Sequence, residues 1–243
     1  MKFENTEVWG FKHALRGMRN PKNSWNKSDS YYEYDNQRDC VTKDANFVIG
    51  ENDMKLAQTL IKAGSEHRKF MRQIFVFVDI IAPLYWWKEF DTYKVGTVAN
   101  STSTMHKLAT TPITIDCFET DDYDGNLKVF DREPYNPDET LNECVDDIID
   151  ICETLRKRYL ETNDKKYWKE LIRWLPESWL QKRTVTMNYE NLLAICGKGQ
   201  RRFHKLNEWS GQDNPNVPNF ISWARTLPYA QELIFIDEME EKN

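Results

Sequence analysis

Two segments of the chain are rich in side chains that can bind a small anionic ligand. One covers residues 88–107 and places glycine, hydroxyl and amide residues between lysines: Gly96, Thr97, Asn100, Ser101, Thr102, Ser103 and Thr104. The other covers residues 188–208 and gathers amides and cations: Asn188, Lys198, Gln200, Arg201, Arg202 and His204. Hydroxyl-rich stretches also form plain surface turns, so a connection without a ligand is the alternative interpretation.

The common signatures of catalysis are missing from the sequence. It contains no G-x-S-x-G, G-x-x-x-x-G-K-[ST], G-x-G-x-x-G or H-E-x-x-H pattern. The four histidines lie far apart, and each by itself is typical of a structural or surface position: His13, His67, His106 and His204. What remains as candidate chemistry is the pair of polar segments.

Neither the cysteines nor the acidic turn indicates a metal site. The five cysteines are odd in number, widely spaced and free of any C-x-x-C pair, so we expect reduced thiols: Cys40, Cys117, Cys144, Cys152 and Cys196. The turn at residues 121–125 has aspartates before a glycine but lacks the ligand spacing and terminal Glu of an EF-hand. We therefore predict a solvated turn and no metal.

The composition is that of a folded globular protein. Of 243 residues, 40% are apolar and 13% aromatic, which excludes a disordered or fibrous chain. The longest apolar run, residues 75–87, is too short for a membrane span, and residues 1–7 do not resemble a secretory signal, so we expect a cytoplasmic protein. Residues 116–154 hold 14 acidic and 2 basic side chains, a local charge of −12, which leaves +6 for the rest because the total is −6. We expect no nucleic-acid partner, but the positive remainder can still form a basic pocket for a small anionic ligand outside that segment.

Periodicity and turn residues predict one α+β domain. Helices are expected from Asp53 to Gly64, over 86–93, from 136 onward, from Lys165 to Pro176, after the capping Asn188, and over the amphipathic stretch 220–233. Strands are expected at 74–81, 113–115 and 183–187, the first of them buried. In the helix after residue 136 one face is expected to be core: Leu141, Val145, Ile148, Ile149, Cys152, Leu155 and Tyr159. The first fifty residues are interpreted as mostly loop, with a short strand or helix near 8–18.

The stretch from Phe75 to Leu108 resembles the signature region of flavin-dependent thymidylate synthases. In that family a strand with F-x-F precedes A-P, a helix carrying a Gln, and the motif R-H-R-x-x-S…E-x-S-x-R-Y. Here Phe75 and Phe77 match F-x-F, and the register holds without a gap from Ala82 to Leu108. Residues 169–176 resemble the family's A-R-x-x-L-P block, and residues 184–188 its strand ending in Asn.

The resemblance covers residues 53–234. It implies a single α+β domain with a mixed or antiparallel sheet and several helices. An irregular N-terminal extension, residues 1–52, would pack on this core, and residues 235–243 would form a charged tail.

The motif residues of the family are largely replaced in this chain. Glu89 stands at the Gln position, Thr92-Tyr93-Lys94 at R-H-R, and the rest of the motif becomes Thr97, Asn100, Thr102, Thr104 and Met105. Lys94 is the cation that remains, and threonine cannot supply the bidentate fork of an arginine. Ile172 holds the Arg position of A-R-x-x-L-P, with Arg173 beside it. The arginine that contacts the pyrimidine in the family is replaced by Gly199 or Gln200, and Arg201 or Arg202 could take its role.

Carried over position by position, the resemblance implies three groups of site residues. The catalytic pair is Arg201 and Arg202. The cofactor-binding set is Thr92, Tyr93, Lys94, Thr97, Asn188 and His204. The substrate-binding set is Glu89, Asn100, Thr102, Thr104, Arg173, Lys198 and Gln200.

Two functional hypotheses follow from the resemblance. The first is a diverged flavin-dependent thymidylate synthase-like enzyme, a homotetramer that methylates a pyrimidine nucleotide reductively, in the manner of dUMP to dTMP. FAD would be its cofactor, with methylenetetrahydrofolate and NADPH as co-substrates. The second is a repurposed scaffold that binds a nucleotide or another phosphorylated ligand without thymidylate synthase activity. Loss of most of R-H-R favours the second hypothesis, and the remaining cations, amides and hydroxyls suit the first.

Overall fold

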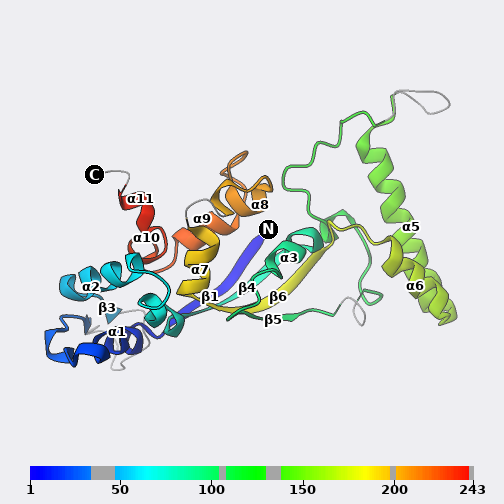
Figure 1. The fold of residues 1–243 in the computed structure, drawn as a ribbon. Coiled ribbons are helices and arrows are strands. Elements are labelled where there is room, and N and C mark those ends of the chain that lie inside the picture. The colour runs from blue at the N-terminus through cyan, green and yellow to red at the C-terminus, as the bar shows by residue number, and fades with distance from the viewer. Residues whose placement is uncertain (34–46, 104–107, 130–137, 198–200, 241–243) are drawn as a thin grey trace. The chain divides into compact units, whose positions relative to one another are not determined.

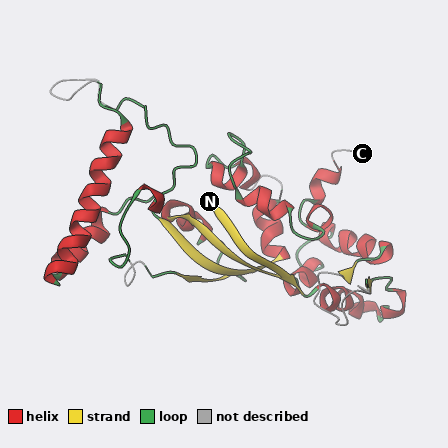
Figure 2. Cartoon of the chain, turned by 180° about the vertical axis from the view of Figure 1, so that it is seen from behind, coloured by secondary structure: helices red, strands yellow, loops and turns green. Residues whose placement is uncertain are grey.

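The computed structural model describes residues 1–33, 47–103, 108–129, 138–197 and 201–240 and has the expected α+β architecture. Its main sheet is antiparallel, in the order β1 (Lys2–Trp9), β4 (Phe75–Pro83), β6 (Leu180–Asn188) and β5 (Val98–Ser101) (Figure 1). A two-stranded sheet pairs β2 (Tyr31–Tyr32) antiparallel with β3 (Phe47–Val48). Figure 2 shows the helices and strands from behind.

The chain forms two compact units. Unit 1 contains Met1, Ile81–Phe90 and Ser101–Arg183, and unit 2 contains Lys2–Ile80, Asp91–Asn100 and Thr184–Asn243. Unit 1 holds α3 (Leu84–Phe90), the 3-10 turn η5 (Ile115–Cys117), α5 (Leu141–Thr162) and α6 (Lys165–Trp174). The helices of unit 2 are α1 (Phe11–Arg19), α2 (Glu51–Lys62), α7 (Tyr189–Cys196), α8 (Asn207–Ser210), α9 (Phe220–Arg225), α10 (Ala230–Leu233) and α11 (Ile236–Glu240). The 3-10 turns of unit 2 are η1 (Asn20–Lys22), η2 (Trp25–Lys27), η4 (Arg68–Gln73) and η6 (Arg201–Phe203).

Strand β4 has one buried and one exposed face. Val76, Val78 and Ile80 are buried, whereas Phe75 and Phe77 are 43% and 39% exposed. This alternation follows from the two-residue period of a strand, whose successive side chains point to opposite faces. The expectation of a fully buried strand was therefore wrong for the F-x-F face.

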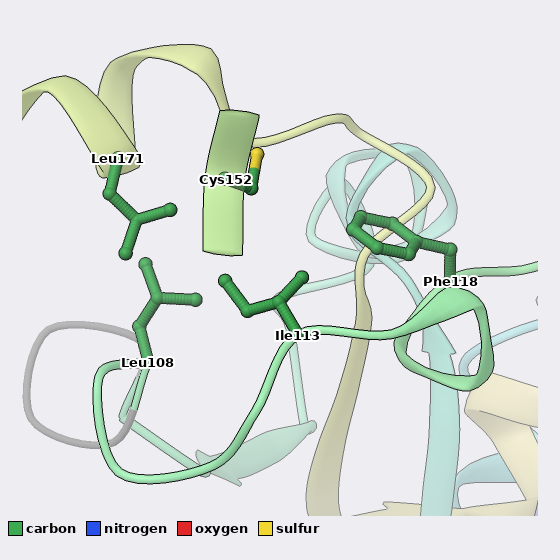
Figure 3. Close-up of a cluster of buried hydrophobic side chains, with 5 residues drawn as sticks. All are labelled: Leu108, Ile113, Phe118, Cys152 and Leu171. Carbon is green, nitrogen blue, oxygen red and sulfur yellow. The ribbon is translucent and has the colours of Figure 1, made fainter. Parts of the chain in front are cut away.

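The two long helices of unit 1 pack on a small apolar core. Five buried side chains from α5, α6 and the preceding chain meet there: Leu108, Ile113, Phe118, Cys152 and Leu171 (Figure 3). A capping box of Thr140 and Glu143 starts α5, and the Asp164 carboxylate accepts the Lys166 N–H at 3.0 Å to start α6. The cap places the start of α5 at Leu141 rather than at residue 136.

The core of unit 2 is built largely from aromatic rings. Phe11 lies edge-on to Tyr189 and to Tyr229, with ring centroids 5.5 Å apart in each pair. Trp209 packs against Phe220 at 5.1 Å, and Phe220 contacts Trp223 at the same distance. Such pairs add to the free energy gained by burying their area. They join α1 to α7 and α8 to α9, and α7 and α8 carry or follow the segments of the candidate site.

Three local predictions need correction. Residues 2–9 form β1 where a loop was expected, whereas α1 confirms the short element expected near 8–18. Residues 113–115 are not a strand, because the chain turns into η5 at Ile115 and only Phe118 makes a single antiparallel bridge, to Trp179. Ile148, predicted to be core, is 42% exposed.

Within the described residues, no helix combines the length and the apolar character that crossing a bilayer requires.

Candidate functional site

In unit 2, Arg201 lies among aromatic rings. Its Nε donates a hydrogen bond to the Tyr93 hydroxyl at 2.8 Å. Its guanidinium carbon is 4.8 Å from the centre of the Trp209 ring and 5.4 Å from that of Tyr93. Trp209 is fully buried, whereas Arg201 and Tyr93 are half-buried. Cation–π contacts and the hydrogen bond therefore hold this arginine in one orientation.

His204 helps to shape the chain that follows Arg201. Its Nδ1 accepts the Leu206 N–H at 3.1 Å, and its carbonyl oxygen accepts the Ser210 hydroxyl at 2.8 Å. Its ring centre is 6.4 Å from that of Trp209. The structure thus brings His204 and Arg201 to the same tryptophan, which belongs to α8.

A second polar contact joins the loop after α3 to the start of α7. Asn188 and Asn191 form a reciprocal cap, in which each side-chain oxygen accepts the other residue's backbone N–H at 3.0–3.1 Å. The Asn191 Nδ2 also donates to the carbonyl of Val95 at 2.7 Å. Gly96 has φ +81°, and a Cβ there would lie 3.1 Å from the Asn188 Nδ2. Glycine thus allows the loop backbone to approach the two amides closely.

Thr97 stabilises the same loop, because its hydroxyl donates to the Tyr93 carbonyl at 2.5 Å. The loop is therefore fixed at Tyr93, by Arg201, and at Val95, by Asn191. Sequence reasoning singled out Arg201 and Asn188 but missed Asn191 and Trp209. Asn191 stands three residues after the capping Asn188, at the position that completes a capping box, and this spacing could have indicated it. No pattern in the sequence indicated Trp209.

A basic cleft with a volume of about 1940 Å³ opens in the same unit. It is lined by parts of residues 17–29, 52–60 and 66–73. Its charged lining residues are five cations and two carboxylates, a net charge of +3: Arg19, Lys22, Lys27, Lys69, Arg72, Asp29 and Glu66. Within the described part of the chain, Lys22, Lys27 and Lys69 form no ion pair. The cleft therefore suits an anionic ligand although the whole chain is acidic.

A buried network fixes one wall of this cleft. The Asp53 Oδ1 accepts the Arg19 Nε at 2.6 Å. The Oδ2 accepts the hydroxyls of Ser28 and Ser30 at 2.6 Å each and the Ser30 N–H at 3.2 Å. Burial alone would raise the pKa of Asp53, but the hydrogen bonds from Ser28, Ser30 and Arg19 hold it below its ordinary value. Asp53 is thus a charged anchor between α2 and the turns after α1.

The first turn of α7 contacts both polar regions. Glu190 accepts hydrogen bonds from Arg72, which lines the cleft, and from Arg68 at 3.3 Å. Burial raises the pKa of the Glu190 carboxyl, but the hydrogen bonds and charges of the two arginines lower it by more. Its pKa therefore lies below the ordinary value, and the carboxylate stays charged. The next residue, Asn191, holds the loop at Val95. The cleft and the 93–97 loop are therefore connected through α7.

The other candidates lie in different surroundings. Arg202 points to carboxylates of α11, with hydrogen bonds to Asp237 and Glu238. Hydrogen bonds from Arg225 and Arg202 hold the pKa of the Glu238 carboxyl at about 2. Arg202 is thereby engaged in holding the C-terminal helix.

Three candidates belong to unit 1. Arg173 pairs with Glu170 at 2.5 Å on α6, Glu89 lies on α3, and the Thr102 N–H donates to the Lys182 carbonyl at 2.9 Å. In unit 2, the side chains of Thr92, Lys94 and Asn100 are exposed. Thr104, Lys198 and Gln200 lie outside the described residues.

Comparison with solved structures identifies the fold. The flavin-dependent thymidylate synthase ThyX of Helicobacter pylori, solved with FAD and dUMP, matches 98% of this chain and 99% of its own with a TM-score of 0.60 at 14% identity. A UMP/dUMP methylase, PolB of Streptomyces cacaoi, solved with 5-Br dUMP, matches 97% of this chain and 93% of its own with a TM-score of 0.57 at 12% identity. No protein-family model and no curated protein sequence matches the chain. The chain therefore has the fold of flavin-dependent thymidylate synthases.

Proposed function

We propose that the protein binds a pyrimidine nucleotide of the dUMP type together with FAD and methylates the nucleotide reductively. The likeness of fold covers almost the whole of both chains, and the neighbouring structures were solved with dUMP or 5-Br dUMP bound. One of those neighbours is also solved with FAD. The motif resemblance around Phe75 to Leu108 points to the same chemistry from the sequence.

The contact of Arg201 with Tyr93 carries this proposal. It joins the two segments in which the sequence predicts the ligand-binding residues, although they are 108 residues apart. A guanidinium held over aromatic rings is oriented in advance, so less rotational freedom is lost when it binds an anion. Arg201 would donate charge-assisted hydrogen bonds to a phosphate or to a pyrimidine carbonyl.

The residues of unit 2 also fit a flavin dinucleotide. The cleft offers three lysines without ion pairs within the described chain, which suits the two phosphates of FAD. Gly96 lets the loop backbone come close to the amides of Asn188 and Asn191, which the proposal places beside the flavin. When bound, the flavin would supply the hydride, with NADPH as reductant and methylenetetrahydrofolate as the carbon donor.

In this proposal the protein positions its ligands and neutralises their charge. Lys94 and Arg201 would bind phosphate, Tyr93 would orient Arg201, and Asn188 would keep the start of α7 facing the loop. No side-chain nucleophile is needed, which agrees with the absence of nucleophile motifs from the sequence.

One observation favours the second hypothesis, a nucleotide-binding scaffold without turnover. Between residues 92 and 104 the sequence has Lys94 as its single cation, where the resembling family has several arginines. An exposed lysine binds phosphate as a point charge and does not fix its orientation. Such a site could bind a nucleotide and still fail to align it for reaction.

Titration calorimetry with dUMP tests the proposal through Arg201→Gln. Loss of a charge-assisted hydrogen bond should weaken dUMP binding by tenfold or more. Arg16→Gln is the matched control, because Arg16 also lies over a tryptophan, Trp25, at 5.6 Å but on the exposed face of α1. Equal affinity of both variants and the wild type would remove Arg201 from the site. Incubation with FAD, NADPH and methylenetetrahydrofolate then separates the hypotheses: formation of dTMP supports the enzyme, and tight dUMP binding without product supports the scaffold.

A further inference from the structure

The last helix, α11, brings two carboxylates to an arginine that adjoins the candidate site (Figure 1). Arg202 donates hydrogen bonds to Asp237 and to the Oε1 atom of Glu238. Its side chain is 9% exposed, so its charge depends on these two counterions. If the pairs are weakened, the guanidinium must move toward water or remain buried with too little negative charge beside it.

Glu238 also binds a second arginine. The Nη1 and Nη2 atoms of Arg225, at the end of α9, donate to the two oxygens of Glu238 at 2.8 and 2.7 Å. The guanidinium carbon of Arg225 lies 4.1 Å from the ring centre of Phe235, which is fully buried. The bidentate pair and the cation–π contact orient Arg225. Glu238 therefore joins Arg202 to a part of the fold that is itself held in place.

The charges of this cluster cancel. Arg202 and Arg225 are its cations, and Asp237 and Glu238 are its carboxylates. The cluster is thus balanced without an anionic ligand, and Arg202 is not available to bind one. This arrangement favours a structural role for Arg202 over the catalytic role that the sequence resemblance implies.

Arg202 and Arg201 are successive residues of the single turn η6. A 3-10 helix has about three residues per turn, so successive side chains point roughly 120° apart. Arg201 accordingly reaches Tyr93 and Trp209, while Arg202 reaches α11. Because η6 is only one turn long, its orientation depends on the contacts of its side chains. Holding Arg202 on one side therefore fixes the direction in which Arg201 leaves the backbone.

We propose that Glu238 is a positioning residue for Arg201 and acts on it through Arg202. This role rests on the proposed function, in which Arg201 binds a phosphate or a pyrimidine carbonyl of a nucleotide of the dUMP type. Helix α11 then belongs to the binding machinery although Glu238 does not touch the ligand. All the residues involved lie in unit 2.

Hydrogen–deuterium exchange of the ligand-free protein tests the positioning. Glu238→Gln should speed exchange several-fold in peptides covering residues 201–209, because fewer ion pairs then hold the turn. Glu153→Gln is the matched control, since Glu153 is also paired with an arginine, Arg156, and also has a pKa of about 2, but lies in unit 1. The control should leave these peptides as protected as in the wild type. Unchanged exchange in Glu238→Gln would overturn the proposal.

Calorimetric titration with dUMP tests whether the effect passes through Arg201. Glu238→Gln should weaken binding by about three- to tenfold, because the guanidinium is misplaced but still present. In the Arg201→Gln background the same change should add nothing, since the two residues act in one chain of contacts. A general loss of stability would weaken binding equally in both backgrounds, and that result would overturn the proposal. Circular dichroism checks that each variant is folded.

Arg202→Met is the second variant and keeps the test decisive if Glu238→Gln does not fold. It should reproduce the faster exchange and the weaker dUMP binding, again only when Arg201 is present. A further loss in the Arg201→Gln background would indicate direct contact of Arg202 with the nucleotide and would contradict the positioning role. A wild type that binds no dUMP would refute the proposed function, and the exchange experiment alone then decides whether Glu238 orders Arg201.

Discussion

Replacing Asp53 with Asn should unfold the wall of the basic cleft at a much lower temperature. Asp53 is fully buried, and its partner Arg19 is 5% exposed. The amide has one acceptor and one donor group where the carboxylate has two acceptors. If the amide oxygen of the variant faces Arg19, the amide NH₂ lies against the backbone N–H of Ser30. If the amide is rotated by half a turn, the NH₂ lies against the guanidinium of Arg19. In both cases two hydrogen-bond donors face each other. In either orientation the variant loses hydrogen bonds and leaves the charge of Arg19 buried without a counterion.

The expected magnitude follows from that uncompensated charge. Breaking one partner of a buried ion pair costs about 3 to 5 kcal/mol of the free energy of unfolding. For a chain of this length each kcal/mol lowers the melting temperature by about 2 to 4 °C, so even the lower estimate gives roughly 6 to 12 °C. Urea unfolding at neutral pH measures the free energy, and scanning calorimetry measures the melting temperature.

Two further variants make the result interpretable. Glu51→Gln removes the same charge from the same helix, but Glu51 is 79% exposed and its pair with Lys55 should contribute less than about 1 kcal/mol. Arg19→Met/Asp53→Asn should recover part of the loss, because no buried charge is then left alone. If Asp53→Asn is no more harmful than Glu51→Gln, the ion pair does not anchor the wall and the reasoning is refuted.

Three further predictions concern the loop, its glycine and the helical hairpin. Lys94→Ala should weaken the binding of dUMP or FAD more than tenfold, whereas Lys88→Ala, which removes an exposed pair with Glu177, should not; calorimetric titration compares them, and unchanged affinity in both excludes the loop from the site. Gly96→Ala should lower the free energy of unfolding by about 1 kcal/mol or more, because φ is +81° and the new Cβ approaches the α7 amides; urea unfolding equal to the wild type would show that the loop can relax. Hydrogen bonds from Arg156 hold the pKa of the Glu153 carboxyl at about 2, below its ordinary 4.5, so the stabilisation it gives is complete above about pH 4.5 and is lost as the pH falls toward 2. Glu153→Gln should flatten that acid dependence, and a variant that loses stability in acid as steeply as the wild type would contradict this.

Local signals in the sequence were sufficient for most helices. The spacing of apolar residues predicted α2, α5 and α6, and the capping side chain of Asn188 predicted α7, all of which the structure contains. These elements are determined by residues within a few positions of one another. Where tertiary contacts decide, prediction failed: β1 has no clear alternation of polar and apolar residues, and it is a strand because it pairs with β4 in the sheet.

The candidate site could be predicted only in part for the same reason. Arg201 and Tyr93 were both singled out, but their contact joins positions 108 residues apart and has no signal in the local sequence. The charge distribution allowed a basic pocket outside residues 116–154 but could not place it, since Lys22, Lys27 and Lys69 belong to different turns and match no motif. Buried polar networks such as that of Asp53 are likewise a property of the folded chain, because an aspartate at the start of a helix is usually exposed.

The central claim, a nucleotide site combined with a flavin site, is tested most directly by a visible absorption spectrum. The full chain is purified, incubated with FAD, freed of unbound flavin, and then titrated with dUMP. We expect a yellow protein whose flavin spectrum shifts as dUMP binds, since both ligands would contact the segments joined at Tyr93 and α7. A protein that stays colourless after incubation with FAD, or a flavin spectrum that dUMP does not change, would contradict the combined site.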